Sequence, residues 1–212
     1  MNYTLLKESI TILHPETKLP LKLYRIISNV KITHGSLVVP AGTIGGYVQS
    51  TENLSEDEND SSWIGHTAMV FDRAKVTGNA FVISKAAVYG DSVITGNSMI
   101  KGTSHISGKS IVEASVIDGN VDVKNSKILD SRLQNSALII DSVLTKSNAA
   151  DGAYVLNSKM FQCSVAGTSQ CINSNADVCY FKNSGSCKDV TVKNTTFDSQ
   201  IELNIQHETP NI

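Results

Sequence analysis

The sequence predicts an all-β protein, a single-stranded three-sided β-helix solenoid with a small β-rich N-terminal cap. Two periodicities support this prediction. Between residues 62 and 112 a small residue recurs every six positions, followed two places later by an aliphatic residue. From residue 112 onward, apolar residues recur every 16 positions. A helix spaces its apolar residues by three and four and a half-buried strand by two, so a fixed longer period indicates stacked repeats.

The six-residue unit is a triad whose first and last members face one interior. Nine consecutive triads run from Ser62-Trp63-Ile64 to Ser110-Ile111-Val112. Residues i and i+2 of an extended segment point the same way, so the small and the aliphatic residue face inward and the middle residue faces outward. Three such sides make one triangular coil, and each coil pairs with the next about 4.8 Å away.

After Val112 the repeat shortens to every 16 positions, and the sides of the coil become five, five and six long. Corner positions of these coils carry Gly, Asn or Asp, among them Gly119 and Asn125, which tolerate a left-handed backbone. Three columns are apolar throughout and predict the inward positions: Val112, Ile128, Leu144, Met160, Ala176 and Val192; Ile117, Leu133, Ala149, Val165, Phe181 and Phe197; and Val123, Ile139, Val155, Cys171 and Cys187.

The segments outside the repeats complete the predicted organisation. β-rich runs at 3–13 and 19–30 flank the turn-forming stretch 14–18, which predicts a hairpin that caps the first coil. Residues 1–61 are expected to hold this cap, the first coil and an acidic loop, residues 62–200 the β-helix, and residues 201–212 a C-terminal tail, of which 206–212 is expected to be loose. The acidic stretch 50–62 is interpreted as a solvated loop, with a cation or partner site as the alternative.

Composition argues against several functional classes. Among 212 residues, 18 Lys and Arg stand against 20 Asp and Glu, and a formal net charge of −2 does not favour nucleic-acid binding. No apolar run approaches the roughly 20 residues of a membrane span. The N-terminus lacks the apolar core of a signal peptide. We therefore expect a cytoplasmic protein with no membrane or nucleic-acid partner.

The four cysteines follow the same long register. Cys163 is expected to stack with Cys179, and Cys171 with Cys187, all at inward positions. A cytosolic protein keeps its thiols reduced, and a buried thiol behaves as a small apolar side chain. A disulfide or a metal site is the alternative, although the spacing of a zinc site is missing.

The triads of residues 62–112 resemble those of the hexapeptide-repeat, left-handed β-helix family. The resemblance implies a left-handed coil, which spacing alone does not give. A second likeness covers roughly residues 24–112, where Gly45-Gly46-Tyr47-Val48, Asn53-Leu54-Ser55 and Trp63 look like the opening of uncharacterised hexapeptide-repeat proteins of enterobacteria and their prophages. It implies an accessory protein of a phage or prophage.

Many hexapeptide-repeat proteins are trimeric acyltransferases, in which a histidine acts as general base and coenzyme A lies between subunits. Carried over to this chain, the resemblance makes His105 and His66 the candidate bases. His105 is the outward residue of its triad, and His66 follows Ile64-Gly65 at a corner; ordinary surface histidines are the alternative. No long loop interrupts the coils to form an acceptor pocket, and no three histidines converge as zinc ligands, so no metal is expected.

Outward positions of the coils suggest a docking surface. Trp63, Phe81, Met99 and Val116 fall on successive coils of one side, and Val93 and Ile111 on another, where Lys75 and Lys127 flank them. A contiguous apolar stripe on a solenoid marks an interface, with a second copy or a foreign protein as its partner, unless the cap or the loop covers it.

These observations favour a non-catalytic scaffold or binding protein that needs no cofactor. It is expected to form a homodimer or homotrimer and to engage a host protein. The alternative is a coenzyme A-dependent acyltransferase, which would bind acetyl-CoA.

Overall fold

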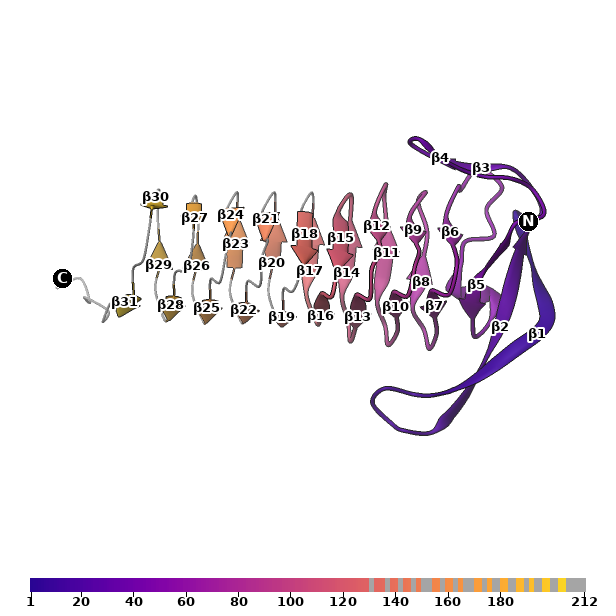
Figure 1. Ribbon diagram of the computed structural model, residues 1–212, viewed down its shortest axis with the longest axis horizontal. Helices are drawn as coiled ribbons and strands as arrows, with labels where there is room; N and C mark the ends of the chain where they lie inside the picture. The colour runs from indigo at the N-terminus through magenta and orange to yellow at the C-terminus, as the bar shows by residue number, and fades with distance from the viewer. Residues whose placement is uncertain are drawn as a thin grey trace.

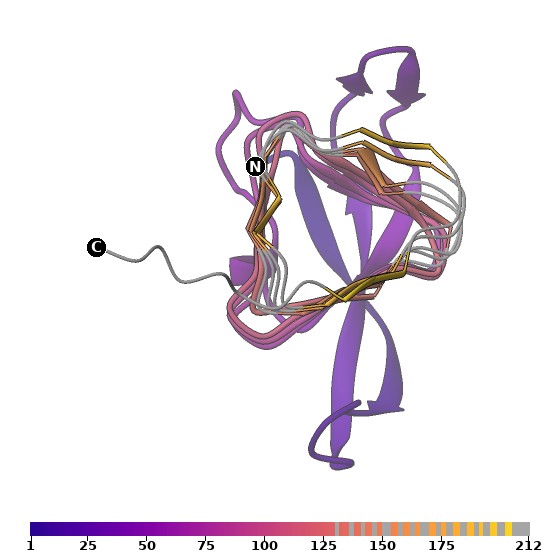
Figure 2. The ribbon, with the colours of Figure 1, turned by 90° about the vertical axis from the view of Figure 1, so that its left-hand side faces the viewer.

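The computed structural model is all-β and confirms a three-sided solenoid of stacked parallel coils (Figure 1). It describes residues 1–129, 132 and 133 with their side chains and, beyond them, the backbone of the strands as far as Asn204. Figure 2 looks along the stack, where the coils overlie one another around a common interior and two hairpins project from them. No helix among the described residues is long and apolar enough to cross a membrane.

The three sides of the solenoid are three sheets. The 12-stranded sheet contains β1 (Tyr3–Leu13), β2 (Pro20–Ser28), β5 (Ile44–Val48), β7 (Met69–Val70), β10 (Ala87–Val88), β13 (His105–Ser107), β16 (Asp122–Lys124), β19 (Leu138–Ile140), β22 (Tyr154–Leu156), β25 (Gln170–Ile172), β28 (Ser186–Lys188) and β31 (Glu202–Asn204). The 8-stranded sheet contains β8 (Lys75–Val76), β11 (Val93–Thr95), β14 (Ile111–Glu113), β17 (Lys127–Leu129), β20 (Val143–Thr145), β23 (Lys159–Phe161), β26 (Asn175–Ala176) and β29 (Thr191–Val192).

The third side is a 9-stranded sheet, and a separate two-stranded sheet lies outside the stack. The 9-stranded sheet contains β6 (Trp63–Ile64), β9 (Phe81–Val82), β12 (Met99–Ile100), β15 (Val116–Gly119), β18 (Arg132–Asn135), β21 (Asn148–Ala149), β24 (Ser164–Val165), β27 (Tyr180–Lys182) and β30 (Thr196–Asp198). The two-stranded sheet pairs β3 (Ile32–His34) with β4 (Leu37–Val39), and a short 3₁₀ helix, η1, spans Thr51–Asn53.

The predicted columns are confirmed by the strand register. Val112 pairs with Ile128, and the same column continues through Leu144, Met160, Ala176 and Val192. The columns that begin at Ile117 and Val123 continue in the same way to Phe197 and Cys187. Val112, Ile117, Val123, Ile128 and Leu133 are at most 1% exposed, so these positions form the interior.

The coil shortens in two steps where the two periods meet. Val93 pairs with Ile111 in the longer register, and Ile111 pairs with Lys127 in the shorter one. Between these steps, Met99 pairs with Val116, one position short of the longer register. Corners accommodate the change with left-handed residues, including Gly119 at φ +116° and Asn125 at φ +52°.

The cysteine register is confirmed in part. The backbones of Cys171 and Cys187 are paired on adjacent coils, which confirms the predicted register of these two residues. Cys163 and Cys179 lie outside the described residues.

The C-terminal end differs from the prediction. β31 pairs with β28, with Ser186 opposite Glu202, so the solenoid continues through Glu202–Asn204. Strand pairing therefore extends past the expected boundary at 201, and Leu203 lies opposite Cys187 in the register. Residues 205–212 lie outside the described residues.

The predicted N-terminal hairpin forms and joins the solenoid edge to edge. β1 and β2 pair antiparallel around the turn at 14–19, β2 pairs antiparallel with β5, and β5 pairs parallel with β7. Register shifts interrupt β1 between Leu5 and Ser9 and β2 between Arg25 and Ile27, and such bulges bend a ribbon. The bent hairpin swings back beneath the first coils instead of only closing their end (Figure 1).

This bend buries a second cluster on the outside of the 12-stranded sheet. The outer cluster consists of Leu23, Tyr47, Phe71, Ala87 and Tyr89, with Ile10, Ile12, Leu21 and Met69 packed around it. Phe71 and Tyr89 stack with ring centroids 5.0 Å apart, and His14 at the hairpin tip meets both rings edge-on. The hairpin therefore covers residues on the outside of two successive coils.

The acidic stretch 50–62 is tied to the coils along most of its length. Asn53 is fully buried; its Oδ1 accepts from the backbone N–H of Gln49 and Ser50, and its Nδ2 donates to the carbonyls of Asp72 and Ala74. Leu54 forms a parallel bridge with Val76. The interpretation of the whole stretch as a solvated loop is therefore wrong, because its first half completes a coil; the exposed residues are Glu52 and 56–59.

Asp60 anchors the returning end of this stretch. Its Oδ1 accepts from the backbone N–H groups of Asn79 (2.9 Å) and Ser62 (2.8 Å), and its Oδ2 accepts from the N–H of Gly78 (2.7 Å). Burial alone would raise the pKa of Asp60, but hydrogen bonds from Ser62, Asn79, Ser55 and Gly78 outweigh it and hold the pKa below its ordinary value.

We predict that Asp60→Asn destabilises the protein by about 1–2 kcal/mol at neutral pH, because an amide N–H then meets a backbone donor. The lowered folded-state pKa means that this contribution is complete above the ordinary aspartate pKa of about 4 and is lost as the pH falls through the folded value. Urea unfolding at several pH values should show the two proteins converging in acid. Asp57→Asn, in the exposed part of the same loop, is the control and should change little. A constant difference at all pH values would contradict the assignment.

Candidate functional site

His105 lies on β13, on the outer face of the 12-stranded sheet. Tyr47, Met69, Ala87 and His105 occupy the same register position on four successive strands of this sheet. The hairpin covers the first three, and His105 is the first of them that lies outside the outer cluster. Its Nδ1 lies 3.2 Å from Oδ1 of Asp122 on the next coil, and the two side chains are 52% and 55% exposed. A carboxylate can orient an imidazole, but this pair lies on an open flat face and not in the described pocket.

His66 lies at the corner after β6, two coils before the corner that leads into β13, and no hydrogen bond or ring contact joins it to His105 in the described part of the chain. Its backbone is left-handed, with φ +58°, at a corner that carries Ser84 (φ +65°) and Gly102 (φ +75°) on the next two coils. A histidine is a strained choice there, since a Cβ disfavours this conformation. Its imidazole makes no hydrogen bond to any residue that the structure describes, and it is exposed.

The predicted docking residues divide into two groups. Trp63, Phe81, Met99 and Val116 do stand in one register on successive strands of the 9-stranded sheet, as predicted. However, Trp63 and Phe81 are only 2% and 1% exposed. The prediction that these two rings offer a free surface is wrong, because part of the N-terminal cap, the β3–β4 hairpin, covers them.

The β3–β4 hairpin is held over the sheet by His34. The His34 ring lies 4.6 Å from the Phe81 ring, and its Nδ1 is 2.7 Å from the carbonyl oxygen of Asn79. Met99 and Val116 remain half-buried beyond the hairpin. On the 8-stranded sheet, Val93 is half-buried and Ile111 is 39% exposed, with Lys75 and Lys127 as their neighbours in register.

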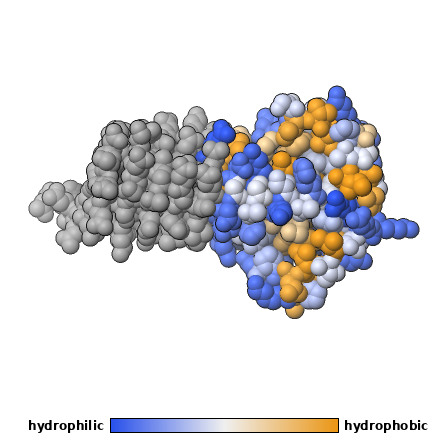
Figure 3. All heavy atoms as spheres, in the orientation of Figure 1, coloured by the Kyte–Doolittle hydropathy of each residue, from blue (hydrophilic) through white to orange (hydrophobic). Residues whose placement is uncertain are grey.

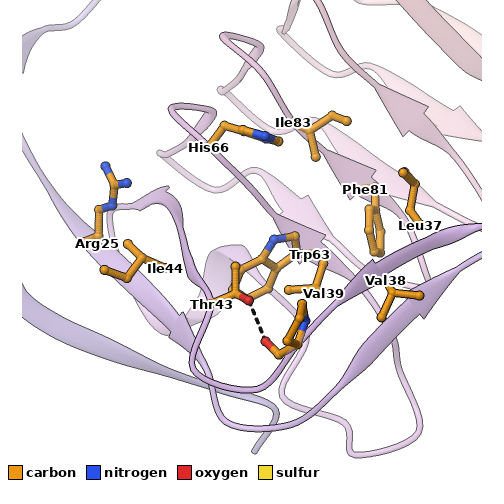
Figure 4. Close-up of a pocket in the computed structure, with 11 residues that line it drawn as sticks. Arg25, Leu37, Val38, Val39, Thr43, Ile44, Trp63, His66, Phe81 and Ile83 are labelled. Carbon is orange, nitrogen blue, oxygen red and sulfur yellow. Dashed lines mark hydrogen bonds between the residues drawn. The ribbon is translucent and has the colours of Figure 1, made fainter.

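A pocket of about 430 Å³ opens between the hairpin and the 9-stranded sheet, and we call it the hairpin pocket (Figure 4). Apolar residues dominate its wall, and several of them are widely exposed, with Ile44 at 51% and Val38 at 53%. Orange atoms gather at this end of the visible face in Figure 3. The lining residues are Arg25, Leu37, Val38, Val39, Pro40, Thr43, Ile44, Trp63, His66, Phe81 and Ile83.

Arg25 is the charged residue of the hairpin pocket. Its guanidinium lies over the Tyr47 ring, 4.7 Å from the centroid, and its Nη1 donates to the Tyr47 hydroxyl at 2.6 Å. Its Nε is buried without a hydrogen-bond partner, and no described carboxylate lies within ion-pair distance of it. The sequence analysis did not single out Arg25, since nothing in the β-rich run around it marks this position.

Other polar clusters among the described residues are structural. His14 Nε2 donates to Asp72 Oδ2 at 3.0 Å, and Nδ1 of the same ring accepts from the backbone N–H of Glu16 and Thr17 at 3.1 Å. Every ring nitrogen is thereby used to fix the hairpin tip, which leaves none for chemistry. The described part of the chain holds no group of three His, Cys, Asp or Glu side chains that could bind a metal.

A comparison with protein family models and with curated proteins finds no match to this chain in either.

Proposed function

We propose that this protein is a non-catalytic β-solenoid scaffold that binds protein chains through outward apolar side chains, with a second copy of itself as the first partner. The observation that supports this is the pairing of Val93 with Ile111 on adjacent coils. Ile111 is 39% exposed, which is wide exposure for an aliphatic residue in the middle of a sheet. Aligned apolar residues on a solenoid face favour association with another surface.

The residues around the Val93–Ile111 pair suit a protein partner. Lys75 and Lys127 flank it in register, which gives an apolar centre with a charged rim, the usual arrangement of an interface. Met99 and Val116 supply a second half-buried pair on the 9-stranded sheet. The resemblance to prophage proteins adds the biological setting that we propose: an accessory protein in the cytoplasm whose assembled form engages a host protein.

Acyl transfer from coenzyme A is the second candidate, and the pair of His105 with Asp122 at 3.2 Å is the observation that favours it. A general base oriented by a carboxylate is a recurring arrangement. Both groups are about half exposed, with side-chain exposures of 52% and 55%, and neither lines the hairpin pocket. The scaffold is therefore the better supported function.

We predict that light scattering gives a mass of two or more chains for the wild type. Ile111→Asp should shift it toward one chain, because a carboxylate at a buried apolar contact is strongly unfavourable. Lys85→Asp, an exposed change at a corner, is the matched control and should leave the mass unchanged. Equal melting temperatures would show that both variants are folded.

A single-chain mass for the wild type at all concentrations, or an unchanged mass for Ile111→Asp, would refute self-association through this line. Calorimetry with acetyl-CoA tests the second candidate in the same samples. Binding at micromolar concentration that is lost in His105→Ala would overturn the scaffold and favour the acyltransferase.

A further inference from the structure

We propose that the hairpin pocket binds an apolar molecule that ends in a carboxylate, with Arg25 and His66 at the acid group and the hairpin residues along the apolar part. This site goes beyond the proposed scaffold, and it shares no residue with the pairs Val93–Ile111 and Met99–Val116 on which the scaffold depends. Each proposal can therefore fail without the other.

The size and lining of the pocket suit a small ligand. Its volume of about 430 Å³ lies within the range of roughly 300–1,000 Å³ typical of small-molecule sites. Figure 4 shows Leu37 and Val38 of the hairpin at one end and Arg25 and Ile44 at the other, with Trp63 between them. Exposed aliphatic residues such as Ile44 gain most when an apolar chain removes them from water.

Arg25 Nη1 donates to Tyr47 and Thr43 Oγ1 to Pro40, but two other donors of the hairpin pocket have no hydrogen-bond partner among the described residues. Arg25 keeps a buried Nε that no described group satisfies, and buried donors of this kind call for an explanation. The indole N–H of Trp63 has no hydrogen-bond partner among the described residues, and Figure 4 shows it on the side of the ring that faces His66. Arg25 and Trp63 offer donors only, so the complementary ligand atom is an acceptor.

Charge selects a carboxylate among the acceptors. The guanidinium of Arg25 has no ion-pair partner in the described part of the chain, and its planar donors match a carboxylate. An apolar surround strengthens that interaction. One guanidinium balances one carboxylate, so the ligand class is a monocarboxylic acid with an aliphatic or aromatic body.

Two features indicate that the pocket is built into the fold. Gly65 leaves room for the indole, since a Cβ there would lie 3.0 Å from Trp63 Nε1 and 3.2 Å from Ile83 Cγ2. His66 occupies a left-handed corner, as Asp72, Asn79 and Ser84 do elsewhere on the coils, so the solenoid backbone itself fixes its place in the wall of the pocket.

The test is a fluorescence titration of the full-length protein with decanoate below its micelle concentration. Trp63 is the single tryptophan of the chain and lines the pocket, so its emission reports this site directly. Decanoate should give a saturable change. Decanol and decylamine, with the same chain but a neutral or a positive head, should bind at least about 10-fold more weakly, as expected when a charge-assisted hydrogen bond is lost.

Two variants separate recognition from folding. Arg25→Met keeps the length of the side chain and should weaken decanoate about 10-fold while leaving decanol unchanged. His66→Gly removes the ring at a position that favours glycine, so it should melt no lower than the wild type and still bind decanoate more weakly. Arg73→Met, at an exposed arginine paired with Asp91 elsewhere on the coils, is the control and should bind like the wild type.

Equal affinity for decanoate, decanol and decylamine would overturn the proposal in favour of nonspecific adsorption to an apolar surface. An unchanged decanoate affinity in both Arg25→Met and His66→Gly, or no saturable change of Trp63 emission, would overturn it too. The oligomeric mass is measured on the same samples, so a failed titration is distinguishable from a failed scaffold.

Discussion

Replacing Gly46 by alanine is expected to destabilise the protein by about 3 kcal/mol, the upper range for forcing an extra carbon into a packed core. A Cβ on Gly46 would lie 2.4 Å from the carbonyl oxygen of Ala68 and 2.7 Å from Ile64 Cγ2. Ala68 cannot move away freely, because its carbonyl accepts the N–H of Tyr47 where the N-terminal strands join the first coil. The added methyl therefore has to break the junction between β5 and β7.

Gly35→Ala is the matched control for this prediction. Gly35 has φ +56° but no atom within 4 Å of an added Cβ, so only the backbone preference is lost, about 1 kcal/mol. Urea unfolding should be followed by Trp63 emission, because the ring packs against Gly45 next to the junction. If Gly46→Ala lowers the free energy of unfolding no more than Gly35→Ala does, the junction between β5 and β7 can rearrange to accommodate the added methyl group, and the prediction is contradicted.

Phe71→Ala is expected to cost about 4 kcal/mol, within the range for removing a buried aromatic ring. Phe71 is fully buried in the outer cluster, between the Tyr89 ring at 5.0 Å and the His14 ring at 5.6 Å. It holds the far half of the β1–β2 hairpin against the coils. Its loss should lower the unfolding midpoint and also release the hairpin tip locally.

Limited proteolysis measures that local release, since the exposed turn residues 15–18 are held to the coils through His14 and should be cleaved faster once the tip leaves the coils. Leu13→Ala is the control: Leu13 belongs to the same hairpin and is 67% exposed, so its removal should change stability by less than about 0.5 kcal/mol. If Phe71→Ala cleaves and unfolds like Leu13→Ala, the outer cluster does not hold the hairpin.

Both predictions concern the cap, and the cap is the part of the fold that the sequence described least. The turn residues at 14–18 predicted the hairpin, and it forms there. Nothing local predicted where it docks, because docking depends on contacts between segments far apart in the chain, such as His14 with Asp72.

The candidate site divides in the same way. His66 was proposed from the sequence because its corner lies in a stretch that resembles coils of the hexapeptide-repeat family, and it does line the hairpin pocket. The sequence did not mark Arg25, and it left the covering of Trp63 and Phe81 by the cap open as an alternative to an interface. The covering of the two rings and the pocket beside them depend on where the β3–β4 hairpin docks. That hairpin is held to the sheet by the long-range contact of His34 with Asn79.

The sequence by itself determined the solenoid, its three sides, the shortening of its coils and the residues that stack in register in its three apolar columns. A repeat fold can be predicted from sequence because each coil contacts only its neighbours. A short period of apolar residues therefore specifies the whole stack. The tertiary structure alone decided which outward faces the two hairpins cover and where they leave a pocket. Each of those contacts occurs once, between segments that are far apart in the chain, so no sequence period predicts it.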